Sequence, residues 1–416
     1  MDLTIIPGKL SGTITAIPSK SQAHRLLICA AFSDSPTELQ CPAANRDIEA
    51  TIDCLNALGA RISRTDSGYL VIPIETIPER AMLNCCESGS TLRFMLPIVG
   101  ALGVDATFLM AGRLPQRPLS PLWEEMERMG CTLSRPTADT IRCQGQLNPG
   151  SYSISGSVSS QFITGLLFAL SLIDGQTHLE ITGKIESQPY IRLTKNAMAL
   201  FKAPRYHSPG RLTVEGDWSN GAFWVAAQML GNDLSIHGLN EDSIQGDRAV
   251  VDICRQLLTG TCTVDASHIP DLVPILSIVA GSAKGAVFTN IQRLRIKESD
   301  RVASTIAMIE ALGGKAESTE DTLTVYGTGY RGGTVDSVND HRIAMSAAIA
   351  STVCTEPVTI LGAEAVKKSY PHFWEEFERL SSHCEPVRRL VWQSPEVLSH
   401  TNHQVDSHAS VSTGSE

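Results

Sequence analysis

The feature that most limits how this chain can fold is an apolar helical run that recurs six times, each time directly after a short polar or glycine-rich segment. The six copies are SKSQAHRLLICAA from residue 19, ESGSTLRFMLPIVG from 87, SVSSQFITGLLFAL from 157, DWSNGAFWVAAQML from 217, DASHIPDLVPILSIVA from 265 and VNDHRIAMSAAIAS from 338. They follow one another at spacings of about 50 to 75 residues, a pattern that indicates an internally repeated architecture.

Each copy is one part of a larger unit. Strand-like segments with period-two alternation, such as KLSGTITAIP, SYSISG and RLTVEG, precede the junctions. The helix after each junction is apolar on nearly every face, so it should be buried at the centre of a domain. Amphipathic helices such as DIEATIDCLNALGARI lie between the junctions and suit the outside of a domain. A chain of 416 residues is long enough for two domains, so we predict an α/β fold with three units in each.

The polar junctions lie where helices begin. A helix start has unpaired N–H groups and a partial positive charge, and both favour an anion. Cationic residues gather at these positions, namely Lys20, Arg25, Arg93, Lys297, Arg301 and Arg342, with Arg117 and Lys368 on nearby loops. A single one of them would be read as a solvated surface charge, but their recurrence at equivalent points of a repeat predicts a local binding site for anionic ligands.

The composition excludes several classes of partner. With 34 Lys and Arg against 44 Asp and Glu, the net charge is −10, which argues against nucleic acid or an anionic membrane. The longest apolar run, 162–173, is shorter than the roughly 20 residues of a membrane span. No export signal or C-x-x-C pair is visible, so we expect a cytoplasmic protein without a metal. The glycine-rich GTGYRG at 327–332 opens no helical run and predicts no nucleotide loop.

Seven motifs, PSKSQAHR, SGSTLR, QRP, SVSSQF, RIKESDR, NDHRIAM and KKSYP, stand in an order that resembles the enolpyruvyl transferases, and within them the branch that acts on shikimate 3-phosphate. The likeness covers about residues 5–382. It implies two inside-out α/β domains, each of three repeated strand-helix units with buried parallel helices. It also implies that the chain starts in one domain, makes the other and returns, which gives 19–214 as one domain and 1–18 with 215–390 as the second. The remaining segment, 391–416, is expected to be a disordered tail, since it contains no Leu, Ile, Phe or Trp from residue 400 onward.

The resemblance implies two small-molecule substrates, shikimate 3-phosphate and phosphoenolpyruvate, and no cofactor or metal. Carried over residue by residue, the contacts to shikimate 3-phosphate are Ser21, Arg25, Ser159, Ser160, Gln161, Ser187, Asp271 and Lys297, with Tyr190 near them. Those to phosphoenolpyruvate are Lys20, Gly89, Arg117, Gln161, Arg301, Arg342 and Lys368. Serine and arginine suit such ligands because a phosphate accepts several short hydrogen bonds and a bidentate ion pair.

The implied reaction needs a base for the substrate hydroxyl and an acid for the methylene carbon of phosphoenolpyruvate. The implied catalytic residues are Lys20, Asp271, Glu298, His341 and Lys368. Asp271 matches the carboxylate beside the accepting hydroxyl, and Glu298 with Lys297 matches the pair that handles protons. Lys20 and Lys368 are further candidates for the proton donor, and the sequence does not choose among them. We expect a monomer, because no coiled-coil heptad is evident.

Two positions depart from the pattern of the family. Glu87 stands where many members carry Asn, so we expect this carboxylate to point away from the anion site or to pair with a cation. Arg293 replaces an Asn that often binds shikimate, which leaves that contact open.

Three other functions remain as alternatives. The first is enolpyruvyl transfer to UDP-N-acetylglucosamine, although the loop MAGRLPQRP lacks the cysteine typical of that branch. The second is an RNA-end cyclase, which the net charge disfavours. The third is a repeat protein that only binds anions, which would not need Asp271, Glu298 and Lys368.

Overall fold

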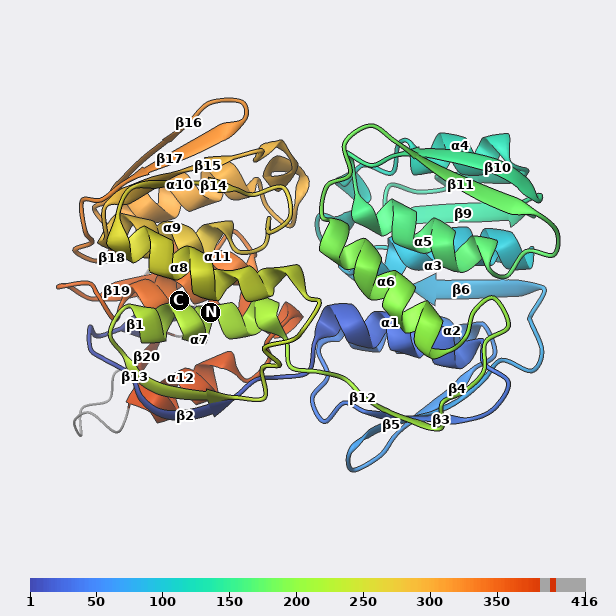
Figure 1. The fold of residues 1–416 in the computed structure, drawn as a ribbon, viewed down its shortest axis with the longest axis horizontal. Helices are drawn as coiled ribbons and strands as arrows, with labels where there is room; N and C mark the ends of the chain where they lie inside the picture. The colour runs from blue at the N-terminus through green and yellow to red at the C-terminus, as the bar shows by residue number, and fades with distance from the viewer. Residues whose placement is uncertain (382–389, 394–416) are drawn as a thin grey trace, which may run out of the picture.

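The computed structural model describes residues 1–381 and 390–393. These residues form two lobes that lie side by side (Figure 1). One lobe contains α1 to α6 and the other α7 to α12, and the chain passes between them twice, before α1 and after β12.

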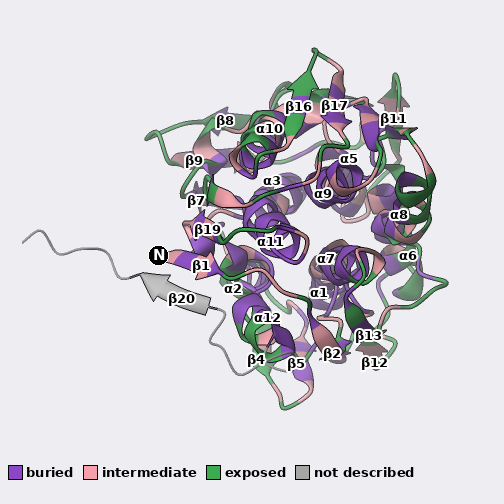
Figure 2. Ribbon diagram, turned by 90° about the vertical axis from the view of Figure 1, so that its left-hand side faces the viewer, coloured by how far each residue is buried: buried purple, intermediate pink, exposed green. Residues whose placement is uncertain are grey.

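The six repeated junctions each open a buried helix. These helices are α1 (Lys20–Ala31), α3 (Gly89–Leu102), α5 (Ser160–Leu170), α7 (Trp218–Met229), α9 (Val273–Ser282) and α11 (His341–Ala350). Figure 2 shows them, coloured as buried, in the interior of the molecule. A serine or aspartate caps five of the six, and its side chain accepts a hydrogen bond from a backbone N–H of the first turn. The prediction of three buried helices in each half is confirmed.

The second helix of each unit lies further out. These helices are α2 (Arg46–Ala57), α4 (Leu122–Arg128), α6 (Gln188–Leu200), α8 (Val250–Thr259), α10 (Arg301–Ala311) and α12 (Phe373–Ser381). Four 3₁₀ helices complete the helical elements of the described chain, namely η1 (Leu114–Gln116), η2 (Gly246–Ala249), η3 (Gln292–Ile296) and η4 (Ala363–Lys368). Of these, η3 and η4 contribute Arg293 and Lys368 to the site described below.

The strands of the first lobe form three sheets. Their orders are β12 (Arg211–Thr213), β3 (Thr37–Gln40), β5 (Gly68–Ile72), β4 (Arg61–Arg64); then β6 (Arg80–Asn84), β7 (Asp105–Leu109), β9 (Thr140–Gly145), β8 (Cys131–Ser134); and β10 (Gly150–Ser155) beside β11 (Thr177–Thr182). In the two larger sheets the first pair of strands is parallel and the next two pairs are antiparallel.

The second lobe repeats this arrangement. Its sheets have the orders β14 (Cys262–Asp265), β15 (Gly285–Thr289), β17 (Thr322–Tyr326), β16 (Lys315–Ser318); then β18 (Gly333–Asp336), β19 (Val358–Leu361), β1 (Asp2–Ile5), β20 (Leu390–Gln393); and β13 (Asp233–His237) beside β2 (Ser11–Thr15). The larger sheets again combine one parallel and two antiparallel pairs. The shared strand order is the structural form of the sequence repeat.

One strand includes residues for which we predicted no structure. β20 pairs antiparallel with β1 through its backbone, so 391–393, the first residues of the expected tail, belong to a sheet. The exposed edge of β1 explains this, because its unpaired N–H and C=O groups can accept another strand. The rest of the expected tail lies outside the described residues.

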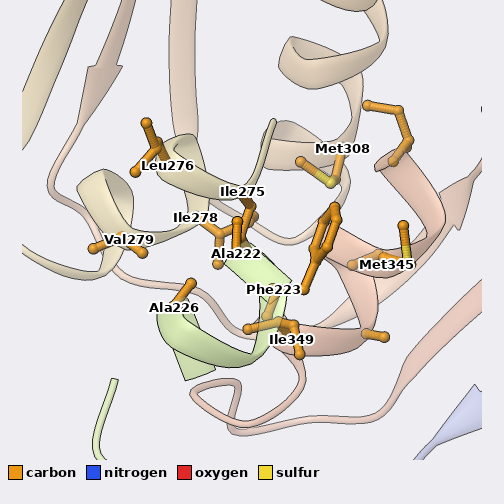
Figure 3. Close-up of a cluster of buried hydrophobic side chains, with 14 of the residues drawn as sticks. Ala222, Phe223, Ala226, Ile275, Leu276, Ile278, Val279, Met308, Met345 and Ile349 are labelled. Carbon is orange, nitrogen blue, oxygen red and sulfur yellow. The ribbon is translucent and has the colours of Figure 1, made fainter. Parts of the chain in front are cut away.

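The buried apolar residues form two separate clusters. One contains residues between Ala23 and Val214, and the other contains residues between Leu3 and Ile14 together with those between Trp218 and Leu380. Figure 3 shows part of the second, where Phe223 of α7 lies among Ile275 and Ile278 of α9 and Ile349 of α11. No helix in the described ranges is both long enough and apolar enough to cross a membrane.

Close helix packing in the first lobe depends on one glycine. A Cβ atom added to Gly165 of α5 would lie 2.2 Å from the carbonyl oxygen of Arg93 and 3.0 Å from Cγ of Pro97, both on α3. Neither atom belongs to a flexible side-chain end, so a larger residue would force the two helices apart. The approach matters for the site, because α3 and α5 both carry residues that line it.

We therefore expect Gly165→Ala to lower the free energy of unfolding by about 1–3 kcal/mol, the usual cost of overpacking a core. Urea unfolding followed by circular dichroism measures this loss. Gly260→Ala is the matched control, because Gly260 has an extended backbone and no described atom lies within 4 Å of the added Cβ. Equal stability of the two variants would contradict the close packing of α3 on α5.

Candidate active site

The first turns of four buried helices, α1, α3, α5 and α11, meet at a cavity between the two lobes, and Asp271, just before α9, joins them. Its lining is Lys20, Ser21, Arg25, Asp47, Gly89, Ser90, Arg93, Phe94, Arg117, Pro118, Val158, Ser159, Ser160, Gln161, Phe162, Ser187, Tyr190, Asp271, Arg293, Ile296, Lys297, Glu298, Arg301, His341 and Arg342. This set contains every site residue predicted from the sequence except Lys368, which lines a smaller adjoining pocket with Glu87, Asn339, His341 and Glu298. The cavity lining has eight Lys and Arg side chains against three carboxylates, so the site is electropositive within an acidic protein.

Arg25 is fixed by its neighbours so that its guanidinium faces the cavity. Its Nε donates to Thr194 Oγ1 at 2.8 Å, and its Nη2 donates to the carbonyl oxygen of Tyr190 at 3.1 Å. The group also lies 5.2 Å from the centre of the Phe94 ring, within the range of a cation–π contact. Since the described partners of Arg25 include no carboxylate, its charge is available to an anionic ligand.

Gln161 connects two buried helices at the cavity wall. Its Oε1 accepts from Arg93 Nη1 at 3.0 Å, and its Nε2 donates to Ser90 Oγ at 2.9 Å. Ser159 and Ser160 begin the same helix, α5, and Ser159 caps it by accepting from the backbone N–H of Gln161. The start of α5 therefore presents two hydroxyls and an oriented amide to the cavity.

Arg301 is the centre of the charge network in the second lobe. Its side chain is 1% exposed and pairs with three carboxylates, those of Asp271 at 2.6 Å, Glu298 at 2.5 Å and Asp340 at 2.9 Å. Arg342 and Lys297 also reach Asp271, at 3.2 and 3.5 Å. Two carboxylates and three cations are thus held together at one wall of the cavity, with Asp340 buried behind them.

Burial and the neighbouring cations shift the pKa of the carboxylates Asp271 and Glu298 in opposite directions. Burial alone would raise the pKa of Asp271, but Arg342, Lys297 and Arg301 outweigh it and hold the pKa well below its usual range. Arg301 and Arg117 likewise keep the pKa of Glu298 low despite its burial. Both carboxylates are therefore ionised at neutral pH.

Burial lowers the pKa of two nitrogen bases at the same wall, Lys297 and His341. Burial lowers the pKa of Lys297 to about 8, although Asp271 opposes the shift, so this amine can both donate and accept protons near neutral pH. Burial and the nearby Arg342 lower the pKa of His341 to about 3, which leaves the imidazole neutral. Neither ring nitrogen of His341 has a hydrogen-bond partner within the part of the chain that the structure describes.

Lys20 and Lys368 are the remaining predicted lysines. Lys20 pairs with Asp47 Oδ2 at 3.0 Å, and although its burial lowers the pKa, Asp47 and Glu298 outweigh this and raise it above the ordinary value. Lys368 donates to Glu87 Oε2 at 2.7 Å and to the carbonyl oxygen of Asn339 at 2.8 Å. We expected Glu87 either to point away from the anion site or to pair with a cation, and the pairing with Lys368 confirms the second alternative.

Arg293, the other departure from the family pattern, connects the two lobes. It donates to the carbonyl oxygen of Val158 at 3.1 Å, to Glu186 Oε2 at 3.2 Å and to Ser187 Oγ at 3.0 Å. It lies beside predicted site residues of the first lobe and lines the cavity itself.

Sequence reasoning gave no role to two residues that the structure places here, Asp47 and Asp340, and named a third, Arg93, only among the cations that predict an anion site. Asp47 and Asp340 compensate Lys20 and Arg301, and Arg93 orients Gln161. Arg93 had a visible signal, its place close to the start of a repeated helix. Asp340 had one too, as the capping residue in front of His341 and Arg342. Asp47 had none, because its contact depends on how α2 packs beside α1.

Comparison with known proteins decides the family. The family model for EPSP synthase (3-phosphoshikimate 1-carboxyvinyltransferase) matches residues 5–377. The chain belongs to the EPSP synthase family. Curated relatives named 3-phosphoshikimate 1-carboxyvinyltransferase agree: that of Clostridium kluyveri is 35% identical, with 92% of this chain and 98% of the relative covered, and that of Clostridium novyi is 36% identical, with 91% and 97% covered.

Two solved structures show the same fold. An EPSP synthase from Acinetobacter baumannii aligns with a TM-score of 0.73 at 20% identity, covering 94% of this chain and 99% of that one. The enolpyruvyl transferase NikO from Streptomyces tendae aligns with a TM-score of 0.68 at 17% identity, covering 91% and 97%. The predicted fold of two inside-out α/β domains is confirmed.

Removal of Arg301, the central cation of this charge network, should strongly lower the free energy of unfolding. Arg301→Met would leave three carboxylates without their shared partner, and breaking a buried pair in this way costs about 3–5 kcal/mol of unfolding free energy. Urea denaturation of the purified variant measures the loss.

The control is Arg295→Met, because Arg295 is 34% exposed and its ion pair with Asp300 is long, 3.6 Å. Such a pair contributes about 0–1 kcal/mol. A loss for Arg301→Met no larger than that of the control would show that the three carboxylates do not depend on Arg301.

Proposed function

We propose that the protein transfers the enolpyruvyl group of phosphoenolpyruvate to the 5-hydroxyl of shikimate 3-phosphate and releases phosphate. The reaction is an addition followed by an elimination, through a tetrahedral intermediate, and belongs to the shikimate pathway toward chorismate and the aromatic amino acids. The observation that carries the proposal is the meeting of the family's motifs at one cavity with eight cationic side chains. Both substrates are polyanions, so a site of this charge suits them.

The wall formed by the first lobe is proposed to bind shikimate 3-phosphate. Its phosphate would lie against Arg25 and the hydroxyls at the start of α5, where the helix terminus adds a partial positive charge. The contact residues are Ser21, Arg25, Ser159, Ser160, Gln161 and Ser187, with Asp271 and Lys297 facing the sugar-like ring from the second lobe. The orientation of Arg25 by Thr194 supports this assignment, because a fixed guanidinium binds phosphate with little loss of side-chain entropy.

Phosphoenolpyruvate is proposed to lie between Lys20, Gly89, Arg117, Gln161, Arg301, Arg342 and Lys368. Gly89 supports this assignment, since an added Cβ would lie 2.5 Å from Arg117 Nη1 and 2.6 Å from Arg93 Nη1. The absence of a side chain at Gly89 thus lets two guanidinium groups approach the start of α3. As the phosphate leaves, its growing charge would be stabilised by the same cations.

The acid and base are proposed to come from the wall around Arg301. Asp271 would accept the proton of the substrate hydroxyl, and Glu298 with Lys297 would handle the proton of the methylene carbon. Lys20 and Lys368 remain candidates for the donor to that carbon. The neutral His341 would donate or accept a hydrogen bond without adding charge.

We also propose that 19–214 is one domain and 1–18 with 215–390 the other, which the two separate hydrophobic clusters support. The protein is proposed to act as a monomer in the cytoplasm, with no nucleic acid, membrane or cofactor involved in the reaction.

The deciding experiment measures phosphate release from phosphoenolpyruvate with shikimate 3-phosphate and with UDP-N-acetylglucosamine in separate reactions. We expect release only with the first acceptor, and a loss of about 10²–10³-fold in kcat for Lys20→Ala, as for the removal of one charge-stabilising group. Lys195→Ala is the control, because Lys195 is exposed on α6 and should leave the rate unchanged.

Phosphate release only with UDP-N-acetylglucosamine would assign the chain to the branch of the enolpyruvyl transferases that acts on that sugar nucleotide. If the folded protein releases no phosphate with either acceptor, the chain has the fold and the anion site without the reaction.

The pairing of Glu87 with Lys368 predicts a second effect on kinetics. Phosphoenolpyruvate has to compete with the Glu87 carboxylate for Lys368, and a partly exposed ion pair contributes about 0.2–1 kcal/mol. Glu87→Gln should therefore lower the KM for phosphoenolpyruvate by up to about fivefold. Glu75→Gln, which removes an exposed carboxylate paired with Arg61, is the control. An unchanged or higher KM in Glu87→Gln would mean that Glu87 helps to hold the substrate.

A further inference from the structure

A second buried carboxylate lies directly behind the cavity, and the reaction as proposed above makes no use of it. Asp247 belongs to η2 in the second lobe, is 3% exposed and is not part of the cavity lining. Its Oδ1 has no hydrogen-bond partner among residues 1–381 and 390–393. An unpaired buried carboxylate oxygen is costly, so its retention needs a physical reason.

The hydroxyl of Tyr190 lies between Asp247 and Asp271. It is 3.3 Å from Asp247 Oδ2 and 3.2 Å from Asp271 Oδ2. A tyrosine hydroxyl has one proton and donates one hydrogen bond, so it cannot donate to both carboxylates at once. The three groups therefore form a chain along which a proton can move, from Asp271 at the cavity wall to Asp247 behind it.

The two carboxylates differ sharply in their surroundings. Asp271 pairs with Arg301, Arg342 and Lys297, which hold its pKa well below the usual range despite its burial. Burial and the charge of Asp271 raise the pKa of Asp247 to about 6. Asp247 is thus mostly ionised at neutral pH, yet it holds a proton far better than Asp271 does.

The groups that face Asp247 come from several elements. They are Tyr190 of α6, Asp271 in front of α9, Arg342 of α11, Asp217 in front of α7 and the hydroxyl of Ser219 on α7. Arg342 and Ser219 favour the ionised form, and Asp271 and Asp217 oppose it. The balance among these groups sets the proton affinity of Asp247.

The chain of three groups exists only when the lobes are together. Tyr190 belongs to the first lobe, whereas Asp247 and Asp271 belong to the second. Gly246 permits the approach, since a Cβ there would lie 2.7 Å from Cγ of Pro189, the neighbour of Tyr190.

We propose that Asp247 is the final acceptor of the proton that Asp271 removes from the substrate hydroxyl, and that Tyr190 relays it. This rests on the proposed function. As the hydroxyl oxygen bonds to the central carbon of phosphoenolpyruvate, its O–H bond breaks and the proton goes to Asp271 Oδ2. Asp271 passes a proton to the Tyr190 oxygen while Tyr190 passes its own to Asp247 Oδ2. When the intermediate collapses, the proton returns by the same path and leaves with the phosphate, so no other reactant is needed.

The reason for the relay is the strength of the pairing at Asp271. A carboxylate surrounded by three cations is a weak base and returns a proton quickly to the alkoxide it came from. A stronger base connected to it through Tyr190 retains the proton for the lifetime of the tetrahedral intermediate. Asp247 acts through Asp271 and touches no substrate, so it is a positioning residue for the proton.

The test compares Asp247→Asn, Tyr190→Phe and the double variant with the wild-type enzyme. Each single change should lower kcat by about 10²-fold or more, the usual contribution of a general base, while the KM of both substrates stays within about threefold. Because both changes break the same relay, the double variant should lose no more than either single one.

The pH profile separates a relay from a structural role. In the wild type, kcat should fall as pH drops through about 6, where Asp247 becomes protonated and can no longer accept. This limb should disappear in both single variants. The control is Glu125→Gln, which changes another buried carboxylate that pairs with Arg128 away from the cavity and should leave the profile unchanged.

Two results would overturn the relay. One is an Asp247→Asn enzyme with wild-type kcat and an intact acidic limb, and the other is losses in Asp247→Asn and Tyr190→Phe that multiply in the double variant. Thermal unfolding of every variant identifies a loss caused by misfolding. Absence of wild-type phosphate release would instead refute the proposed function, so the two failures are distinguishable.

Discussion

The apolar helices that recur along this chain can be buried on nearly every face only if strands and amphipathic helices surround them, and this constraint decides where the site lies. A helix enclosed on all sides still has two ends, and its polar first turn must reach solvent or a polar cavity. In both lobes the first turns open toward the other lobe, where the cavity lies. The anion site is therefore a direct consequence of how the core is built.

Placing so many cations at buried helix starts carries an electrostatic cost, and acidic residues from other elements offset it. Asp47 faces Lys20, while Asp271, Glu298 and Asp340 share Arg301. Arg25 has no such carboxylate among its described partners. This uneven compensation divides the site by function: the uncompensated cation suits a permanently charged phosphate, and the ionised carboxylates suit proton transfer next to the cations that hold them.

How much of this structure the sequence predicts depends on how far apart in the chain the interacting residues lie. Six buried helices could be predicted because a first-turn position depends only on local spacing, and the resemblance to the enolpyruvyl transferases implied most residues of the cavity. The partners of those residues could not, because Asp47 and Asp340 reach their cations through the packing of separate helices. Glu87 illustrates the limit: local charge indicated that it would point away from the anion site or pair with a cation, but only the approach of the two lobes identifies Lys368, 281 residues away. β20 was missed for the same reason, since its partner β1 lies at the opposite end of the chain.

The contacts that cross between the lobes show what closure changes chemically. Glu87 meets Lys368, Arg117 lies 3.8 Å from Glu298, and Tyr190 meets Asp247 and Asp271. Each joins one group of the first lobe to an oppositely charged or hydrogen-bonding group of the second, so closure has favourable contacts of its own that oppose the repulsion among the cations. A bound polyanion would add to these contacts at Lys20, Arg25 and Arg342 and would compete with one of them at Lys368. The approach of the lobes thus brings the proposed acid, base and anion site together, through side-chain contacts that neither lobe makes alone.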